Sequence, residues 1–385
     1  MLPVSRAFVA CALYSFLLIS LPTAAAESSP ITAIIGVSVI PMDEDRVLEN
    51  QTVIIADGRI AEIGNTDDVV VPDNAKRIEG DNRYLMPGLA DMHTHLRGTD
   101  EYVNYLAFGV TTVMHLGGSQ ARGRELLEHR RQIEAGKLMG PNIYTTERVF
   151  DGDPPASGGA YRFSSPDAAR EKVIELKEAG FDFIKVYNNV PYAVFQATVD
   201  EARKQQMPVF GHVPRNFAPL TAMREGQNAV VHTEEFFFTY FNGPRSTSDM
   251  DLGYEVDLSD IPALVEVLVA NDVAVMPDLS FTFTDLLMWD SLDLIWTDTE
   301  MRYVHPDKVF DWKVSNINRR DEIENFIVRE QWKYELMQEL TRQFQEAGIL
   351  QVIGTDASLP GLFPGKAAHR ELTELVKAGL SNFDA

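Results

Sequence analysis

Polar side chains of the kinds that bind metal ions follow short apolar runs at several points along this chain. Each run has the length and β-branched content of a buried strand. In a (β/α)8 barrel the carboxyl ends of the strands converge on one mouth, so residues distant in sequence meet there. The residues in question are His93, His95, Lys185, His212, His232 and Asp356. Their order predicts a metal-dependent site at such a mouth.

Each of these residues has an ordinary structural explanation when taken alone. A single histidine at a strand end is more often a hydrogen-bonded structural residue, and Asp356 after I-G-T could cap a helix. His93 and His95 in D-M-H-T-H are two residues apart, so on a strand both point to one face. Lys185 in F-I-K-V-Y is harder to explain, because lysine is almost never buried without a partner. Taken together, the residues favour a metal site.

The chain alternates between strand-like and helix-like segments from residue 86 onward. The predicted strands are 86–92, 110–115, 142–146, 182–187, 208–212, 229–232, 273–277 and 349–355. The predicted helices are 100–108, 119–136, 165–180, 191–206, 218–226, 259–271, 321–347 and 366–378. Eight strand–helix pairs predict an α/β fold of the (β/α)8 TIM-barrel type. A doubly wound sheet is the alternative, but the sequence has no glycine-rich phosphate loop.

A small β domain is predicted ahead of the barrel. I-T-A-I-I-G-V-S-V-I and Q-T-V-I-I-A are strand-like, and A-D-G-R-I reads as a tight hairpin. The predicted organisation is therefore a signal peptide at 1–26, a small β domain at 27–85 and the barrel at 86–385.

These motifs together resemble the amidohydrolase superfamily of metal-dependent hydrolases, in its imidazolonepropionase-like and prolidase-like branch. The matching segments are Y-L-M-P-G-L-A-D-M-H-T-H, F-G-V-T-T-V, D-F-I-K-V-Y, P-V-F-G-H-V-P and G-T-D-A. The resemblance runs from about residue 31 to the last residue. It implies a barrel beside a small β-sandwich that is completed by strands returning after the barrel. We therefore expect this chain to be cut short, with an incomplete sandwich and poor solubility for 27–385.

The resemblance also implies two divalent metal ions. Lys185 would take up carbon dioxide as a carbamate that bridges the metals, since a desolvated lysine loses its proton readily. His93, His95 and Asp356 would hold the first metal, and the histidines at 212 and 232 the second. Imidazole and carboxylate ligands suit zinc best, with manganese or cobalt as alternatives.

The activity implied by the resemblance is hydrolysis of an amide, peptide or cyclic amide bond. A metal-bridging hydroxide would be the nucleophile, and Asp356 would pass its proton to the leaving amine. Dipeptides and N-acyl amino acids are the favoured substrates, and lactams and lactones stay open. The alternatives are a one-metal deaminase, a lactone or ester hydrolase, and a non-catalytic binding protein. The metal content of the purified protein would distinguish three of these hypotheses. We expect about two metal ions per chain for the amide hydrolase, one for the deaminase and none for the binding protein.

Three further residues are candidates for substrate binding. Tyr187 lies two positions after Lys185, on the same side of the strand and nearer the mouth. Arg215 follows H-V-P and could hold a carboxylate. His115 ends a strand at a position where the resembled chains mostly carry aspartate.

Aromatic residues are concentrated in segments that follow predicted strands. F-F-F-T-Y-F occupies 236–241, and a long loop at 278–320 contains Trp289, Trp296 and Trp312. Together with a loop at 147–164, they suggest an apolar substrate pocket with a lid. The alternative is that they form small cores of their own or a homo-oligomer interface.

The formal net charge of −23 restricts the choice of partners. Such an acidic chain argues against nucleic acid and anionic membranes as partners. No apolar stretch of 20 residues follows the first 26, so we expect no membrane association after the signal peptide is cleaved. A small-molecule substrate is the expected partner.

Residues 1–26 have the features of a secretory signal peptide. Arg6 precedes an apolar stretch that ends at Leu21, and three alanines ending at Ala26 offer a small-residue cleavage site. The only cysteine, Cys11, lies in this segment, so the mature chain would contain no disulfide.

We predict export to the periplasm or beyond, with cleavage near Ala26. N-terminal sequencing of the exported protein should then begin close to Glu27. The mature chain should not react with a thiol reagent after denaturation, because Cys11 is removed. An exported protein that still begins at Met1 would contradict the cleavage.

Overall fold

The computed structural model describes residues 30–242, 256–290, 297, 299–317 and 323–385 of the chain. It divides into two compact units between Pro87 and Gly88. This division lies two residues beyond the boundary expected at 85. The predicted signal peptide lies outside the described residues.

The described part of the first unit is a single five-stranded sheet. Its strands are β1 (Thr32–Val39), β2 (Leu48–Ala56), β3 (Arg59–Asn65), β4 (Lys76–Glu79) and β5 (Tyr84–Leu85). The order is β3-β2-β1-β4, with β5 also paired to β1. The predicted hairpin is confirmed: Asp57 and Gly58, with φ of 52° and 70°, form the two-residue turn between β2 and β3. Val37, Val39 and Val53 form the core of this unit.

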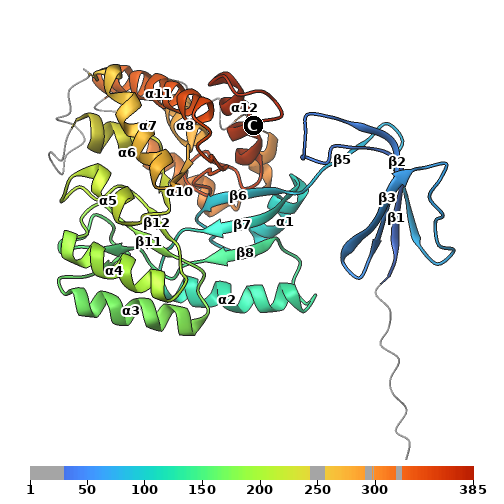
Figure 1. Ribbon diagram of the computed structural model, residues 1–385, viewed down its shortest axis with the longest axis horizontal. Helices are drawn as coiled ribbons and strands as arrows, with labels where there is room; N and C mark the ends of the chain where they lie inside the picture. Colours follow the sequence, from blue (N-terminus) through green and yellow to red (C-terminus); the bar gives the residue numbers. More distant parts are fainter. Residues whose placement is uncertain (1–29, 243–255, 291–296, 298, 318–322) are drawn as a thin grey trace, which may run out of the picture. The chain divides into compact units, whose positions relative to one another are not determined.

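Two parallel sheets form the centre of the second unit. One contains β6 (Leu89–Thr94), β7 (Val110–His115) and β8 (Asn142–Thr145), which lie side by side in Figure 1. The other has the order β10-β9-β11-β12-β13-β14. Its strands are β9 (Phe150–Asp151), β10 (Tyr161–Arg162), β11 (Ile184–Val186), β12 (Val209–Gly211), β13 (Ala229–Val231) and β14 (Ala274–Met276). Seven of the eight predicted barrel strands are therefore present.

The predicted strand at 349–355 is wrong as a continuous strand. These residues and their neighbours make only isolated bridges, between Val275 and Gln351 and between Thr94 and Ala357. The backbone amide of Met92 donates to the Ile353 carbonyl at 2.8 Å. The segment is nevertheless hydrogen-bonded both to β14 and to β6, and this contact carries Asp356 to the ends of the other strands.

Helices cover the outside of the parallel strands, as predicted. They are α1 (Asp100–Ala107), α2 (Gln120–Glu134), α3 (Pro166–Ala179), α4 (Tyr192–Lys204), α5 (Pro219–Glu225), α7 (Ile261–Ala270), α11 (Ile323–Glu346) and α12 (Lys366–Lys377). Figure 1 shows α3 and α4 packed side by side. The start of α3 is formed as expected, because the Ser165 side chain accepts from the Ala168 amide and Pro166 occupies the first turn.

The region after β14 is more helical than the predicted loop at 278–320. It contains α8 (Leu279–Asp290), η4 (Thr299–Tyr303) and α10 (Pro306–Ile317). Trp312 is buried against Val304 and Phe363 in a small cluster of its own, which favours the small-core alternative there. Trp296 lies outside the described residues, and no side-chain position is described for Trp289.

The aromatic run at 236–241 is also part of the core. It forms α6 (Glu234–Phe236) and η1 (Phe237–Phe241), a single π-helical turn. The Phe236 ring packs on Phe344, and the Phe237 ring on Trp332, both from α11. These buried phenylalanines stabilise the contact with α11, so the expectation that they line a substrate pocket is wrong.

Side chains that alternate along β11 point to two different sides of the strand. On β11, Ile184 and Val186 pack into the core beneath the helices. Phe183 points the other way, into an inner cluster with Met114, Val231 and others. Lys185 and Tyr187 follow on that same inner side, because strand side chains alternate with a period of two. The sequence F-I-K-V-Y therefore places Phe183 in the inner apolar cluster, followed on the same side by the Lys185 amine and the Tyr187 phenol.

No helix among the described residues is long and apolar enough to cross a membrane.

Gly211, directly before His212, allows β11 and β12 to approach closely. Its φ is +144°, and an added Cβ would lie 2.1 Å from the Val186 carbonyl oxygen. We expect Gly211→Ala to destabilise the fold by about 3 kcal/mol or more, because both the backbone and its neighbour must move. Gly180→Ala is the control, since its φ is +90° but the space around it is open; it should cost about 1 kcal/mol. Thermal unfolding of both variants tests this, and equal losses would contradict it.

Candidate metal centre

The predicted ligand residues converge at the carboxyl ends of the parallel strands. His93 lies on β6 and His95 follows it; Lys185 lies on β11; His212 and His232 directly follow β12 and β13. All are buried except His95, which is partly exposed. Asp356, also buried, follows the segment that bridges to β6 and β14.

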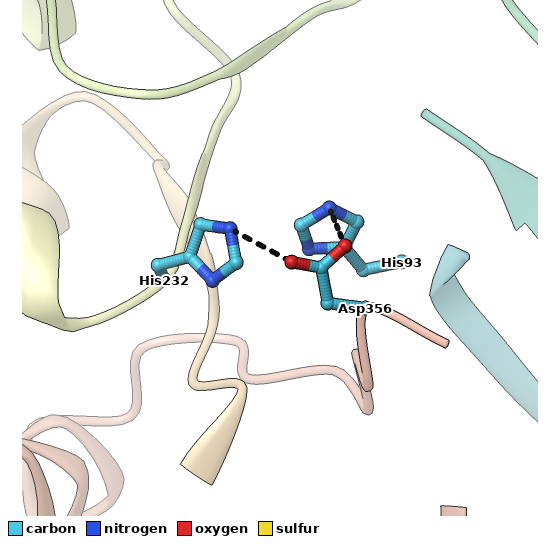
Figure 2. A group of neighbouring side chains, drawn as sticks. All are labelled: His93, His232 and Asp356. Carbon is cyan, nitrogen blue, oxygen red and sulfur yellow. Dashed lines mark ion pairs between the residues drawn. The ribbon is translucent and has the colours of Figure 1, made fainter. Parts of the chain in front are cut away.

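Asp356 lies at the centre of the group. Figure 2 shows its carboxylate between the rings of His93 and His232, with one oxygen facing each ring. The distances from Asp356 are 3.4 Å to His93 Nε2, 3.7 Å to His232 Nε2 and 3.0 Å to His95 Nε2. Lys185 Nζ lies 3.3 Å from His93 Nε2. His212 joins the group through its ring, whose centroid is 5.2 Å from that of His232.

All four ligand histidines are held by oxygen atoms at Nδ1. His93 and His232 contact Asp278 Oδ2, at 2.8 and 2.9 Å. His95 Nδ1 lies 2.8 Å from the Gly117 carbonyl oxygen. His212 Nδ1 contacts Asn188 Oδ1 at 2.8 Å and Glu235 Oε1 at 3.0 Å.

These contacts fix the form of the imidazoles. Oxygen acceptors at Nδ1 require the proton there, so a neutral ring presents an unprotonated Nε2. Metal-binding histidines usually have this arrangement, in which a carboxylate or carbonyl orients the ring and makes it more basic. The contacts therefore prepare four Nε2 lone pairs for a metal ion.

Asp278 connects two histidines that belong to different predicted metal ions. The same oxygen, Oδ2, faces both imidazoles and also accepts from the His232 backbone amide at 3.1 Å. The side chain is fully buried. The neighbouring Gly354 has no room for a side chain, because its Cβ would lie 2.1 Å from Asp278 Oδ1. Asp278 is therefore a positioning residue for both rings.

Three of the site residues have left-handed backbone conformations. The φ angles of His232, Asp278 and Asp356 are 62°, 54° and 58°. Such values are uncommon outside glycine, although histidine, aspartate and asparagine adopt them more readily than other residues. Strained backbone is concentrated at functional sites, where the surrounding fold holds it in place.

Burial and charge shift the protonation of the group. Burial lowers the pKa of Lys185 to about 8, against the attraction of Asp356 and other acids, so the uncharged amine is a minority form near neutral pH but far more abundant than for an exposed lysine. Burial acts to raise the pKa of Asp356, but the nearby histidines outweigh it and hold that pKa well below its usual range. For His232, burial acts to lower the pKa, whereas the charges of Asp278 and Asp356 raise it to about 9.

The donor set fits divalent metal ions. Ligand atoms of His93, His232 and Asp356 all lie within 4.8 Å of one another, and all three residues are buried. Imidazole nitrogen and carboxylate oxygen are the ligands that zinc and similar ions prefer. Because the pKa of His232 lies at about 9, this ring must lose a proton when it binds a metal ion, so metal binding should release protons.

A cavity of about 420 Å³ opens onto this group. Its wall contains His95, Lys185, Tyr187, His212, His232 and Asp356, together with Gly117, Gly118, Val149, Ser157, Gly159, Glu234, Phe281 and Leu359. This volume suits a small molecule. The residues from 149 to 159 come from the predicted loop at 147–164, which therefore contributes to the cavity.

The three predicted substrate-binding residues have different positions. Tyr187 lines the cavity and its ring packs at a tilt of 39° against that of His212, with centroids 4.1 Å apart. Arg215 is not part of the wall that the described residues form; it pairs with Glu235 at 3.5 Å and lies over the Phe238 ring. His115 is buried outside that wall.

His115 also differs from the ligand histidines in its ring form. Its Nδ1 accepts from the Leu96 backbone amide at 3.0 Å, so a neutral ring carries its proton on Nε2. This is the opposite of the form that a ligand at Nε2 requires, and it agrees with leaving His115 out of the predicted ligand set.

Asp278, Glu234 and Glu235 were not identified from the sequence. Asp278 directly follows the predicted strand 273–277, so the strand-end rule that singled out the ligands also applied to it. The sequence instead places it at the start of the predicted loop at 278–320. The two glutamates lie within three residues of His232, and that proximity was the available signal.

Comparison with known proteins identifies similar chains. No family model matches. Ochratoxinase of Aspergillus niger is 31% identical over 143 residues, which are 32% of this chain and 29% of that protein. Dihydroorotase of Mycobacterium tuberculosis is 39% identical over 74 residues, 19% of this chain and 16% of that protein. Imidazolonepropionase of Clostridium tetani is 39% identical over 57 residues, 14% of each. The chain thus matches less than a third of the length of each of these curated relatives.

Solved structures resemble the chain over most of its length. Bottromycin amidohydrolase has a TM-score of 0.70 and 23% identity, over 92% of this chain and 75% of that one. A Xaa-Pro dipeptidase with bound methionine has a TM-score of 0.62 and 18% identity, over 92% and 84%. Ochratoxinase of A. niger has a TM-score of 0.63 and 16% identity, over 93% and 82%. These similarities establish the fold.

Removal of the Asp278 carboxylate should weaken metal binding. We expect Asp278→Ala to lower metal affinity about 10- to 100-fold, as is usual when a residue that orients a ligand is lost. Asp278→Asn retains one acceptor oxygen and should have a smaller effect. Metal titration of the apoprotein measures both variants, with circular dichroism as the check on folding. Unchanged affinity in a folded Asp278→Ala would contradict the positioning role.

Proposed function

The chain belongs to the amidohydrolase superfamily, and from this we propose that it is a metal-dependent hydrolase of amide bonds. The curated relatives match only short parts of it, so the activity is inferred from the site. We further propose that the parallel strands and the 350–357 segment close into an eight-stranded barrel of the imidazolonepropionase-like and prolidase-like type. Hydrogen bonds from that segment to both β14 and β6 support closure.

The observation that carries the proposal is the common orientation of the four histidines. Each Nδ1 faces a protein oxygen, and the Nε2 atoms of His93, His95 and His232 all face the Asp356 carboxylate. A purely structural cluster would have no need for four rings of the same form around a buried amine and a carboxylate. The proposed ligands are His93, His95 and Asp356 for one metal, His212 and His232 for another, and carboxylated Lys185 for both. Bound divalent metals, zinc above all, would supply Lewis-acid activation of water and of the scissile carbonyl.

The protein residues have separate roles in this proposal. The lowered pKa of Lys185 makes the uncharged amine, which is the form that reacts with carbon dioxide, accessible near neutral pH. Asp356, kept ionised by the surrounding histidines, accepts a proton from the attacking water and returns it to the leaving nitrogen. Tyr187, on the cavity wall, donates a hydrogen bond to a substrate oxygen.

A one-metal deaminase is the second candidate. The observation that favours it is the cluster of His93, His232 and Asp356, whose ligand atoms lie within 4.8 Å of one another and could hold one ion. Such an enzyme has no need for a buried lysine at this position, so Lys185 favours the two-metal hydrolase. We also propose export to the periplasm or beyond, supported by the features of residues 1–26.

Metal analysis combined with a substrate screen tests the proposal. The purified protein should bind about two metal ions per chain and hydrolyse at least one member of a set of dipeptides, aminoacyl amides, N-acyl amino acids, lactams and lactones. Removal of the metal with a chelator should abolish this activity, and added zinc should restore it. One ion per chain with ammonia release from a heterocyclic substrate would favour the deaminase.

Substitution of Lys185 should remove the bridging ligand. We expect Lys185→Ala to lose one or both metal ions and nearly all activity, with partial recovery when bicarbonate or a short carboxylic acid is added to fill the space. The control is Lys204→Ala, on the exposed face of α4, which should have no effect. A Lys185→Ala variant with full metal content and normal turnover would refute the carbamate.

Substitution of Asp356 should separate metal binding from proton transfer. Asp356→Asn keeps the shape and one oxygen ligand but cannot accept a proton. Turnover should fall by about 10²- to 10⁴-fold, the usual contribution of a general acid–base residue, while much of the metal is retained. Turnover per bound metal is the decisive measurement. If turnover falls only in proportion to metal loss, Asp356 is a ligand alone.

A further inference from the structure

Glu234 is the charged residue of the cavity wall that has no place in the proposed metal centre. It begins α6, two residues after the ligand His232, and lines the same cavity. Its side chain is 13% exposed, so a bound ligand would shield it from water. A carboxylate so close to the reacting centre can bind a cationic group of the substrate.

Lys333 forms an ion pair with the Glu234 carboxylate. Its Nζ lies 2.5 Å from Glu234 Oε2 and 2.6 Å from Glu330 Oε2. Arg329 also pairs with Glu330, at 3.4 Å. Lys333 is buried and reaches only the Oε2 side of Glu234 in the contacts among described residues. These contacts fix the Glu234 side chain and leave Oε1 available to a ligand.

Outside the metal centre, the described wall has no cationic side chain that would pair with an anion. Lys185 is the only lysine or arginine on it, and its role is metal binding. Arg215, which the sequence suggested as a carboxylate partner, pairs with Glu235 instead. The net charge of −23 also favours the approach of cationic over anionic molecules.

We propose that Glu234 binds the free α-ammonium group of an aminoacyl amide, and that the group on the leaving side of its scissile bond is uncharged. This inference rests on the proposed function and narrows its substrate class. In this proposal the ammonium lies on the carbon next to the scissile carbonyl, because Glu234 lines the same cavity as the ligand His232. Water adds its oxygen to that carbonyl carbon, the C–N bond breaks, and the leaving nitrogen takes a proton, which gives an amino acid and an amine.

The same features disfavour N-acyl amino acids. Their acylated nitrogen carries no charge for Glu234, and their free carboxylate finds no cation on the described wall apart from the metal centre. The apolar side chains of Val149, Phe281 and Leu359 on the wall suit an aliphatic side chain on the substrate. Leucine derivatives are therefore the appropriate probes.

Binding of two matched hydroxamates tests the inference without turnover. Leucine hydroxamate and N-acetyl-leucine hydroxamate both chelate metal ions, but only the first carries an ammonium group. Calorimetry on the zinc-loaded protein should give about 10- to 100-fold tighter binding of leucine hydroxamate, the usual range for one charge-assisted hydrogen bond. Equal affinities would overturn the inference.

Two substitutions separate Glu234 from the ion pair behind it. Glu234→Gln should reduce the preference to about twofold or less, with unchanged zinc content and unchanged affinity for the acetylated compound. Glu330→Gln removes the other carboxylate that contacts Lys333, away from the cavity wall, and should keep the full preference. If both variants lose the preference for leucine hydroxamate equally, or if Glu234→Gln loses zinc, Glu234 has a structural role only. The inference is then wrong.

Hydrolysis kinetics with matched substrates distinguish a failure of this inference from a failure of the proposed function. Leucine p-nitroanilide should be cleaved with a lower KM than N-acetyl-leucine p-nitroanilide, and leucyl dipeptide amides should be preferred over the free dipeptides. Hydrolysis without these preferences contradicts the role of Glu234 alone. A protein that binds neither zinc nor hydroxamate contradicts the proposed function itself.

Discussion

A single carboxylate oxygen, Asp278 Oδ2, connects the parts of the site. It faces two imidazoles from different strands and accepts the backbone amide of one of them. An ionised acid without solvent is costly unless its oxygen atoms are hydrogen-bonded. The positions of β6, β13 and β14 are therefore coupled, because moving any one of them would leave this charge or an imidazole without its partner.

Further buried acids support that segment. Glu371 of α12 accepts from the backbone amides of Leu279 and Ser280, at 3.0 and 2.6 Å, and so holds the start of α8 directly after Asp278. Asp91 accepts from the Thr355 hydroxyl at 2.7 Å, next to Asp356. Burial raises the pKa of both Glu371 and Asp91 to about 8. Around neutral pH these acids can stay protonated, which limits the negative charge that the interior must hold.

Much of the fold and most of the candidate centre could be predicted because they follow from local patterns. Lys185 could be singled out from F-I-K-V-Y, since the neighbouring residues are those of a buried strand and a lysine is almost never buried without a partner. The segment at 349–355 has the composition of a strand, but only its tertiary contacts decide that it forms isolated bridges. The phenylalanines at 236–238 could equally line a pocket or fill a core, and the choice depends on α11, nearly 100 residues later. Asp278 could not be assigned, because its partners His93 and His232 come from two other strands.

The left-handed backbone at His232, Asp278 and Asp356 limits how this centre can change during evolution or engineering. Exchanging ligands to alter metal preference is usually planned from donor chemistry alone. Here a replacement must also tolerate a positive φ, which a β-branched residue does not do without considerable strain. Asparagine, aspartate, histidine and glycine are the residues best suited to these three positions. The protein backbone thus restricts the ligand repertoire before any metal ion exerts a preference.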